Sequence, residues 1–162
     1  FVGLRDLGPA LSPQSAFQII QGLETVSLRM EKHCANAAKV AEYLSNHNKV
    51  SRVIYAGLDE GEAGDRANKY LKGGHGALCG FELKGGKSSG EKFIDNLNMF
   101  YHVANIGDAR SLAIHPATTT HSQLSDEDME AAGVNPSYVR LSIGIEHIDD
   151  ILNDLKNALD AA

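Results

Sequence analysis

The chain has 162 residues, of which 43% are hydrophobic and 22% charged, and its formal net charge is −6. This composition is typical of a globular domain with a substantial core, and it excludes disordered and fibrous proteins. The acidic balance and the scattered basic residues exclude an electrostatic footprint for nucleic acid or an anionic membrane, so we expect a small molecule or another protein as partner.

The cysteines and the N-terminus bear on the cellular setting. Cys34 and Cys79 lie far apart and outside any C-x-x-C spacing, which predicts neither a disulfide framework nor a cysteine zinc site. No apolar run has the length of a membrane span, and a signal-peptide pattern is missing. We therefore expect a cytoplasmic protein. Because the chain begins with Phe1 and soon meets a Gly8-Pro9 break, we also expect it to be a fragment of a longer protein.

A long helix is the first predicted element. Ser12 and Pro13 suit an N-cap and the first helical position, and the pattern continues to about residue 46. We expect one helix, straight or bent, interrupted in its pattern at Ser27. Its length predicts that it joins two structural regions, with residues 1–46 as the joining segment and residues 47–162 as a domain. The apolar positions at helical spacing are Ala16, Ile20, Leu23, Met30, Cys34, Ala37, Ala41 and Leu44.

Strands dominate the middle of the chain. We expect a strand at 50–56, a polar loop at 57–76, and a second strand at 77–83. This second strand places Ala77, Cys79, Phe81 and Leu83 on one face. Residues 85–97 read as a glycine turn that leads into an amphipathic helix. The "GGKSSGEK" within it lacks the spacing of a phosphate-binding loop, since Phe81 stands where that motif needs glycine. Residues 100–106 and 111–115 are expected to be strands.

The last third completes an α+β fold. Ser125 and Asp128 predict a capping box for a short helix that ends near Gly133. A strand follows within "SYVRLSIGIE", residues 137–146, and an amphipathic helix covers about 148–160. Because several strands follow one another without strict βαβ alternation, we expect a mostly antiparallel sheet covered by helices.

Arg140 is the odd residue in an otherwise apolar strand. Alternation places Val139, Leu141 and Ile143 on the core face and Arg140 on the opposite face. An arginine there is either solvated and paired with a carboxylate, or a rigid fork directed at a ligand carboxylate or phosphate. The pattern alone favours the solvated alternative.

Other polar residues give weaker signals. His115 and His121 could join Asp108 at a metal, but no spacing typical of zinc or iron is present, so we favour hydrogen-bonded structural histidines and predict no metal site. No nucleophile elbow is present. The polar segment 100–121 is the best candidate for a functional loop because it is rich in Asn, Asp, Thr and His between two strands.

Several motifs together resemble one enzyme family. They are "LGPALSPQSAFQIIQGLETVSLRMEKHCANAAKVAEYL", "GFELKGG", "NIGDARSLAIHPATTTHSQLS" and "VRLSIGIEHIDDILNDL". Together they closely resemble the C-terminal part of the Cys/Met-metabolism enzymes that depend on pyridoxal phosphate. The "NIGDARSL" phrase is similar to the O-acetylhomoserine sulfhydrylase branch, whereas cystathionine synthases and lyases read like S-L-G-G-x-E-S-L. Ala56 replaces the usual proline of a Tyr-Pro-Gly turn.

The resemblance implies a fold and site residues. The fold would be the small C-terminal domain of a fold-type I pyridoxal-phosphate enzyme, preceded by a long joining helix. Arg140 would grip the α-carboxylate of the amino-acid substrate, with Asn105 assisting. The cofactor lysine and the other cofactor ligands would lie upstream, in an N-terminal domain that this sequence lacks. Lys69 in "NKYLKGGHG" only partly matches the lysine motif and is expected to be a surface loop residue.

The resemblance also implies an activity. The parent protein, a homotetramer, would convert O-acetylhomoserine and sulfide into homocysteine in methionine biosynthesis. The 162-residue chain alone would be inactive, with no catalytic or cofactor-binding residue. Two alternatives stay open: cystathionine γ-synthase or γ-lyase activity, and a non-catalytic module that binds an amino acid for regulation.

Overall fold

The computed structural model describes residues 2–8 and 10–162, so Phe1 and Pro9 of the expected N-terminal start lie outside the described residues. The elements, in chain order, are α1 (Val2–Leu7), α2 (Pro13–Glu24), α3 (Val26–Ser45), β1 (Val50–Ile54), α4 (Gly61–Tyr70), β2 (Leu78–Leu83), α5 (Gly86–Asp95), β3 (Tyr101–His102), β4 (Leu112–Ile114), a 3₁₀ turn (Pro116–Thr118), α6 (Asp126–Ala131), β5 (Tyr138–Ser142) and α7 (Ile148–Ala161).

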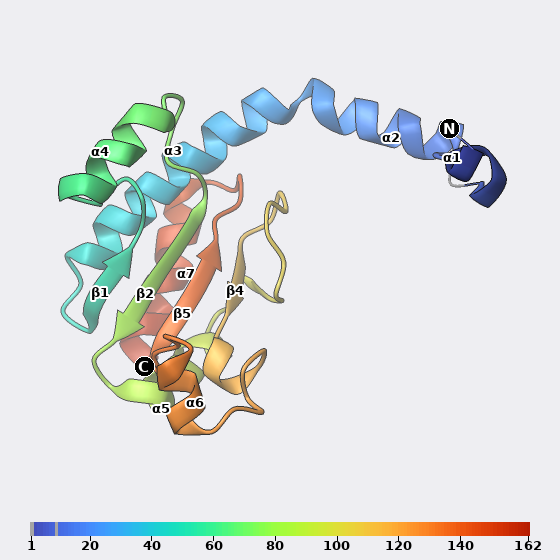
Figure 1. The fold of residues 1–162 in the computed structure, drawn as a ribbon. Helices are drawn as coiled ribbons and strands as arrows, with labels where there is room; N and C mark the ends of the chain where they lie inside the picture. Colours follow the sequence, from blue (N-terminus) through green and yellow to red (C-terminus); the bar gives the residue numbers. More distant parts are fainter. Residues whose placement is uncertain (1, 9) are drawn as a thin grey trace.

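The described strands form one sheet in the order β1-β2-β5-β4-β3 (Figure 1). The pairs β1–β2, β2–β5 and β4–β5 are antiparallel, and only the short β3–β4 pair is parallel. The predicted α+β class with a mostly antiparallel sheet is therefore confirmed.

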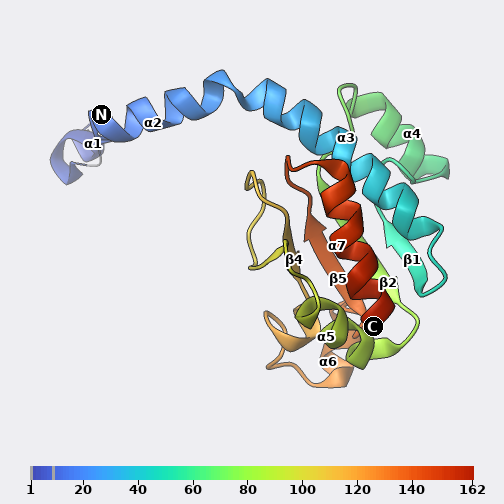
Figure 2. The same ribbon diagram turned by 180° about the vertical axis from the view of Figure 1, so that it is seen from behind.

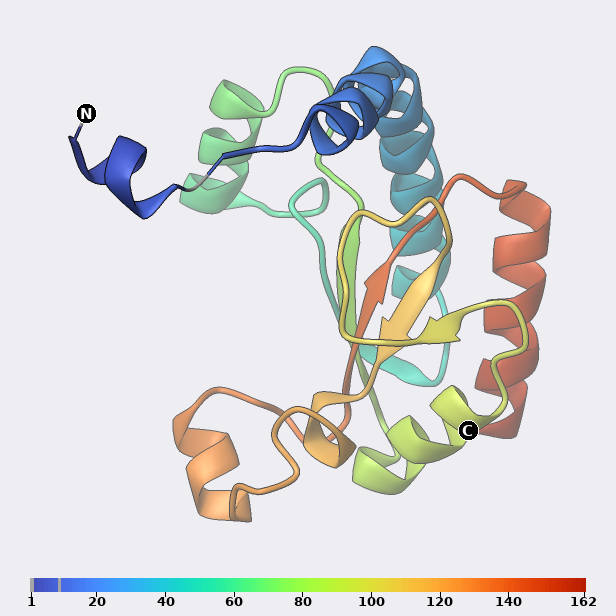
Figure 3. The same ribbon diagram turned by 90° about the vertical axis from the view of Figure 1, so that its right-hand side faces the viewer.

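One face of the sheet is covered by helices. Figure 2 shows α3 and α7 lying across this face, and α5 packs against α7. The alternation predicted for two strands holds here, since Cys79, Phe81, Val139 and Leu141 are completely buried. Phe81 contacts Phe93 of α5 edge to face, with ring centroids 5.2 Å apart. On the opposite side of the sheet, α4 and the segment that contains α6 project outward (Figure 3).

The predicted long helix is in fact two helices. Ser12 caps α2 as expected, because its Oγ accepts a hydrogen bond from Ser15 N at 3.1 Å. The helix is interrupted at Thr25, not at Ser27, and Arg29 donates to Gly22 O at the end of α2. A cation at this place neutralises the free carbonyls of a helix C-terminus. The α2 helix extends away from the sheet and buries none of its side chains (Figure 1).

The loop predicted for residues 57–76 contains α4, so that prediction was wrong. The side chains of α4 that face the protein are small: Gly64 and Ala67 are buried. A Cβ on Gly64 would lie 2.5 Å from Asp59 O, so glycine allows a close approach of the preceding loop. Lys69 is exposed, as expected, but it belongs to this helix.

The other predicted strands are shorter than expected, whereas α7 has nearly the expected bounds. The strand expected at 100–106 is reduced to Tyr101–His102. Ser125 and Asp128 form the predicted capping pair, with Asp128 N donating to Ser125 Oγ at 3.2 Å. In α7, Ile151, Leu155 and Leu159 are completely buried. No helix in the described part of the chain combines the length and the apolar character needed to cross a membrane.

Candidate functional site

Arg140 lies on the face of the sheet that α3 and α7 leave uncovered. In the register of the sheet, its neighbours are Gly80 of β2 and Ile114 of β4. Since the strand has a period of two, the residues that flank Arg140 are buried on the helical side while Arg140 itself is half-buried on the other side. The sheet therefore holds this side chain on a rigid element.

The guanidinium of Arg140 has unused hydrogen-bonding capacity. Its Nη2 donates to the backbone oxygen of Asn105 at 3.3 Å. Its Nε is buried and has no acceptor among the described residues. A guanidinium has five N–H donors, and a buried donor without a partner requires an explanation. The arrangement suits a ligand that brings acceptor oxygens.

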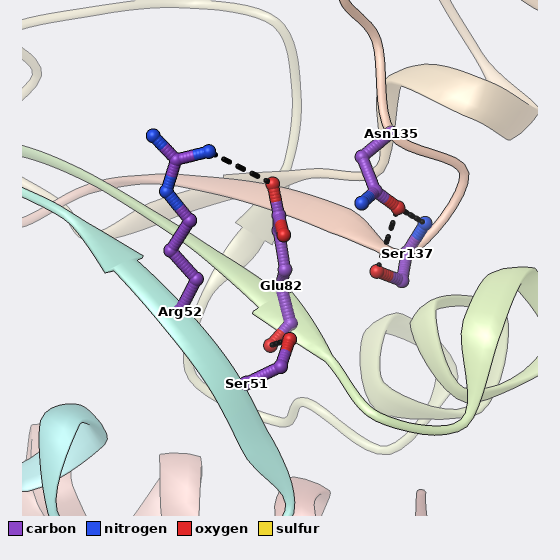
Figure 4. Close-up of polar contacts among 5 residues, drawn as sticks. All are labelled: Ser51, Arg52, Glu82, Asn135 and Ser137. Carbon is purple, nitrogen blue, oxygen red and sulfur yellow. Dashed lines mark hydrogen bonds and ion pairs between the residues drawn. The ribbon is translucent and has the colours of Figure 1, made fainter. Parts of the chain in front are cut away.

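Arg140 lines a pocket of about 490 Å³, which also includes Tyr138, Asn135, Arg52 and Glu82. The nearby carboxylate is already engaged, since Glu82 lies 3.8 Å from Arg52 Nη1 (Figure 4). Asn135 Oδ1 accepts from both the backbone N and the Oγ of Ser137, each at 2.9 Å (Figure 4). The solvated alternative needed a carboxylate partner for Arg140, and no ion pair of Arg140 is found in the described part of the chain.

The two predicted site residues are brought together, but not through both side chains. Asn105 is exposed, and its backbone carbonyl, not its amide group, contacts Arg140. The predicted pair therefore lies side by side, 35 residues apart in sequence.

Three polar residues that the sequence did not single out fix the loop that carries Asn105. The carboxylate of Glu146 accepts hydrogen bonds from Ser111 N at 2.7 Å and Ser111 Oγ at 2.9 Å. Ser142 Oγ accepts from Gly107 N at 3.2 Å. Ser142 and Glu146 belong to the "RLSIGIE" phrase and Ser111 to "NIGDARSL", so the only sequence signal was the polar positions of these two motifs.

The histidines considered as metal ligands differ in their surroundings. His115 is completely buried, with Nε2 2.8 Å from Pro136 O and Nδ1 2.9 Å from Thr118 Oγ1. Both ring nitrogens are thus used in structural hydrogen bonds, as predicted. His121 Nδ1 is 2.9 Å from Thr120 Oγ1. No cluster of three His, Cys, Asp or Glu suited to a metal occurs among residues 2–8 and 10–162.

His115 should make the stability of the chain depend on pH. Burial lowers the pKa of His115 from its ordinary value of 6.5. The unfolded chain therefore takes up the proton first on acidification, so the free energy of unfolding should fall as the pH drops from about 7 to about 5. The His115→Gln variant lacks this pH-dependent contribution to the free energy of unfolding. Urea titrations at several pH values should show the stability difference between the two proteins shrinking towards low pH, and parallel curves would contradict the prediction.

The pocket does not contain the groups that a covalently attached aldehyde cofactor needs. No lysine lines either hollow beside Arg140, the larger one or the one of about 380 Å³ that includes Asp59 and His75. Lys69 Nζ lies 5.2 Å from the ring centroid of Tyr70 on the exposed helix α4. The lining of these two pockets therefore fits a carboxylate-bearing ligand and supplies no lysine that could hold an aldehyde cofactor covalently.

Comparisons with known proteins agree with the motifs. The model of the family described as "Cys/Met metabolism PLP-dependent enzyme" matches residues 2–160. The O-acetyl-L-homoserine sulfhydrylase of Leptospira meyeri is 57% identical over 97% of this chain and 36% of that protein. The L-methionine gamma-lyase of Fusobacterium nucleatum subsp. polymorphum is 44% identical over 99% of this chain and 40% of that protein.

A solved structure is also similar. The chain from Campylobacter jejuni, described as an O-acetylhomoserine (thiol)-lyase with N'-pyridoxyl-lysine-5'-monophosphate, has a TM-score of 0.86 and 44% sequence identity. The match covers 97% of this chain and 37% of that one. The present chain thus spans between 36% and 40% of the length of these relatives.

Proposed function

Because this chain belongs to the Cys/Met metabolism PLP-dependent enzyme family, we propose that it is the substrate-carboxylate-binding part of an O-acetylhomoserine sulfhydrylase. The whole protein would convert O-acetylhomoserine and sulfide into homocysteine and acetate, a step of methionine biosynthesis in the cytoplasm. The observation that carries the proposal is Arg140, which is held by the sheet beside a pocket with a buried donor that no described residue satisfies.

The chain's own residues would bind and orient the substrate. Arg140 has the charge and the planar donors that match a carboxylate in a bidentate geometry. The Asn105 carbonyl limits the directions that the guanidinium takes up, and the Asn105 side chain would assist at the same carboxylate. Fixing the carboxylate holds the reacting carbons of the substrate in one place, which lowers the entropy cost of the reaction. The cofactor site would lie in the remainder of the protein, and the chain alone would be inactive.

The surface of α2 supports a larger protein. Phe17, Ile19, Ile20 and Leu23 are each more than half exposed. A stripe of this kind on a long helix normally packs against another element. We propose that an N-terminal cofactor domain of the same polypeptide and further copies in a homotetramer cover it, with residues 1–46 joining that domain to residues 47–162.

Methionine γ-lyase activity is the second candidate, since a relative with that name is 44% identical over nearly the whole chain. Cystathionine γ-synthase or γ-lyase activity in the same family, and a non-catalytic amino-acid-binding module, are the remaining alternatives. All of these would use Arg140 for a carboxylate, so Arg140 does not distinguish them.

The test is product formation by the full-length polypeptide that contains this sequence, purified with pyridoxal phosphate. Homocysteine from O-acetylhomoserine and sulfide is the expected product. Preference for cysteine over sulfide would indicate a cystathionine synthase, and release of a thiol from methionine without added O-acetylhomoserine would indicate the lyase. A native polypeptide of only the present length on a gel would support the non-catalytic module.

Gly80 should be important because it lies beneath the ring of Tyr138, next to Arg140 in the register. A Cβ on Gly80 would lie 2.7 Å from Tyr138 Cζ. Gly80→Ala should therefore push the ring into the pocket and raise the KM for O-acetylhomoserine about 10-fold. Adding Tyr138→Ala removes the displaced ring and should restore most of the loss. Steady-state kinetics of both variants check this, and an unrescued double variant would contradict it.

A further inference from the structure

We propose that Glu146 is a positioning residue for the substrate carboxylate, acting through the loop of residues 105–111 and through Arg140. The proposal rests on the proposed function. Glu146 itself has no hydrogen bond or ion pair with Arg140 among the described contacts, so its effect must pass through the loop.

The carboxylate of Glu146 is attached to the end of the loop at Ser111. Its two carboxylate oxygens accept separately from the N–H and the hydroxyl of Ser111. Ser111 is completely buried, and its Oγ in turn accepts from Gly144 N at 2.9 Å. Without the carboxylate, the Ser111 N–H would be a buried donor without a partner, which is costly. Hydrogen bonds to an ionised acceptor are the stronger kind.

The backbone of Glu146 is itself held in a fixed position. The side chain of Asn36, on α3, donates to the backbone oxygens of Gly144 and Glu146, both at 3.0 Å. Ile145 N donates to Ala109 O at 2.9 Å. A Cβ on Gly144 would lie 2.5 Å from Ser111 N and 2.6 Å from Ala109 O, so glycine is needed for the two segments to approach this closely. The backbone that carries Glu146 is therefore anchored to the core helix α3, and the loop is anchored to the Glu146 carboxylate.

The loop is also connected to β5 and to Arg140 itself. Ser142, two residues after Arg140 on the same strand, accepts from Gly107 N, and Asn105 O accepts from Arg140 Nη2. The loop is thus held at Ser111 by Glu146, at Gly107 by β5, and at Asn105 by the arginine. Arg110 is the cation within the loop, and its Cζ lies 4.7 Å from the ring centroid of Tyr101. The Arg110 guanidinium therefore interacts with the Tyr101 ring. Releasing Ser111 would free the part of the loop that positions the Asn105 carbonyl.

The experiment uses the full-length protein with pyridoxal phosphate and compares Glu146→Ala, Glu146→Gln and the control Asp154→Asn. Asp154 is matched because it is also a carboxylate that accepts backbone N–H groups, those of Asn98, Met99 and Phe100, but it lies on α7. Glu146→Ala should lower kcat/KM for O-acetylhomoserine about 10-fold and leave the KM for sulfide unchanged. Glu146→Gln keeps one acceptor for Ser111 N and should recover most of the activity, and it remains testable if the alanine variant fails to fold.

A double-mutant cycle separates positioning from general stability. In an Arg140→Ala background, Glu146→Gln and Glu146→Ala should cause no further loss, because the group they position is gone. Asp154→Asn should cause the same change in both backgrounds. Equal losses from the Glu146 variants in both backgrounds, or no loss in either, would overturn the proposal.

Hydrogen exchange provides a readout that does not need activity. The amides of residues 105–111 should exchange at least about 10-fold faster in Glu146→Ala, while β2 and β5 keep their protection. Unchanged exchange in this loop would overturn the proposal. If the unsubstituted protein formed no homocysteine, the proposed function would fail, and the exchange measurement would still decide whether Glu146 fixes the loop.

Discussion

Arg140→Ala is expected to reduce kcat/KM of the full-length protein for O-acetylhomoserine at least about 30-fold, which corresponds to about 2 kcal/mol or more. The reason is that Arg140 is the cation at the pocket whose donors are not used up by a carboxylate of the described chain. A substrate carboxylate would lose both its charged partner and its orientation. The kcat/KM of Arg140→Lys should lie between those of the unsubstituted protein and Arg140→Ala, because lysine keeps the charge but lacks the planar fork. Steady-state kinetics with purified protein measure these losses.

Arg52→Ala is the matched control for this prediction. Arg52 lines the same pocket, but it is paired with Glu82 and its side chain is 66% exposed. A long ion pair whose arginine is largely solvated contributes little, so kcat/KM should change less than about 3-fold. If Arg52→Ala were as damaging as Arg140→Ala, the general positive field of the pocket would matter rather than a specific clamp. If Arg140→Ala had no effect, Arg140 would be structural.

The strand that carries Arg140 shows what sequence alone predicts well. Alternation in "YVRLS" correctly assigned Val139 and Leu141 to the core and Arg140 to the open face, because a strand permits only two side-chain directions. The same rule placed Cys79 and Phe81 in the core. These positions are decided locally, which is why the α+β class was also predictable.

The helix α4 shows where local patterns fail. Its buried positions are Gly64 and Ala67, which contribute almost no apolar signal, and the helix was taken for a polar loop. Only the contact with the Asp59 backbone explains why small residues are required there. The interruption at Thr25 was placed two residues late for a related reason, since Arg29 reaches back to the Gly22 carbonyl and this contact leaves no apolar pattern.

The surroundings of the site were the least predictable part. Asn105 contacts Arg140 through its backbone carbonyl, so its side-chain identity does not encode the contact. Ser111 and Glu146 are 35 residues apart, and their hydrogen bonds depend on the pairing of β4 with β5. A tertiary arrangement of this kind is not visible in periodicity, and this explains why Arg140 could be singled out while the groups that fix its loop could not.

Phe81→Ala is expected to lower the free energy of unfolding of the 162-residue chain by about 3 to 5 kcal/mol. Phe81 is completely buried on the interior strand β2, and its replacement removes the edge-to-face contact with Phe93 and leaves a cavity under α5. Urea denaturation followed by circular dichroism measures the change. A loss below about 1 kcal/mol would mean that the core between the sheet and α5 is not packed as described.

Phe17→Ala is the informative control, since Phe17 is 57% exposed on α2. In the 162-residue chain it should change the free energy of unfolding by less than about 0.5 kcal/mol, because the described residues leave most of this side chain exposed. In the full-length protein the same substitution should cost more than about 1 kcal/mol if the ring is covered by another domain or copy. Phe81→Ala should cost the same in both, because its surroundings lie entirely within this chain. A Phe17 effect that is equally small in both proteins would mean that this side of α2 faces solvent in the whole enzyme.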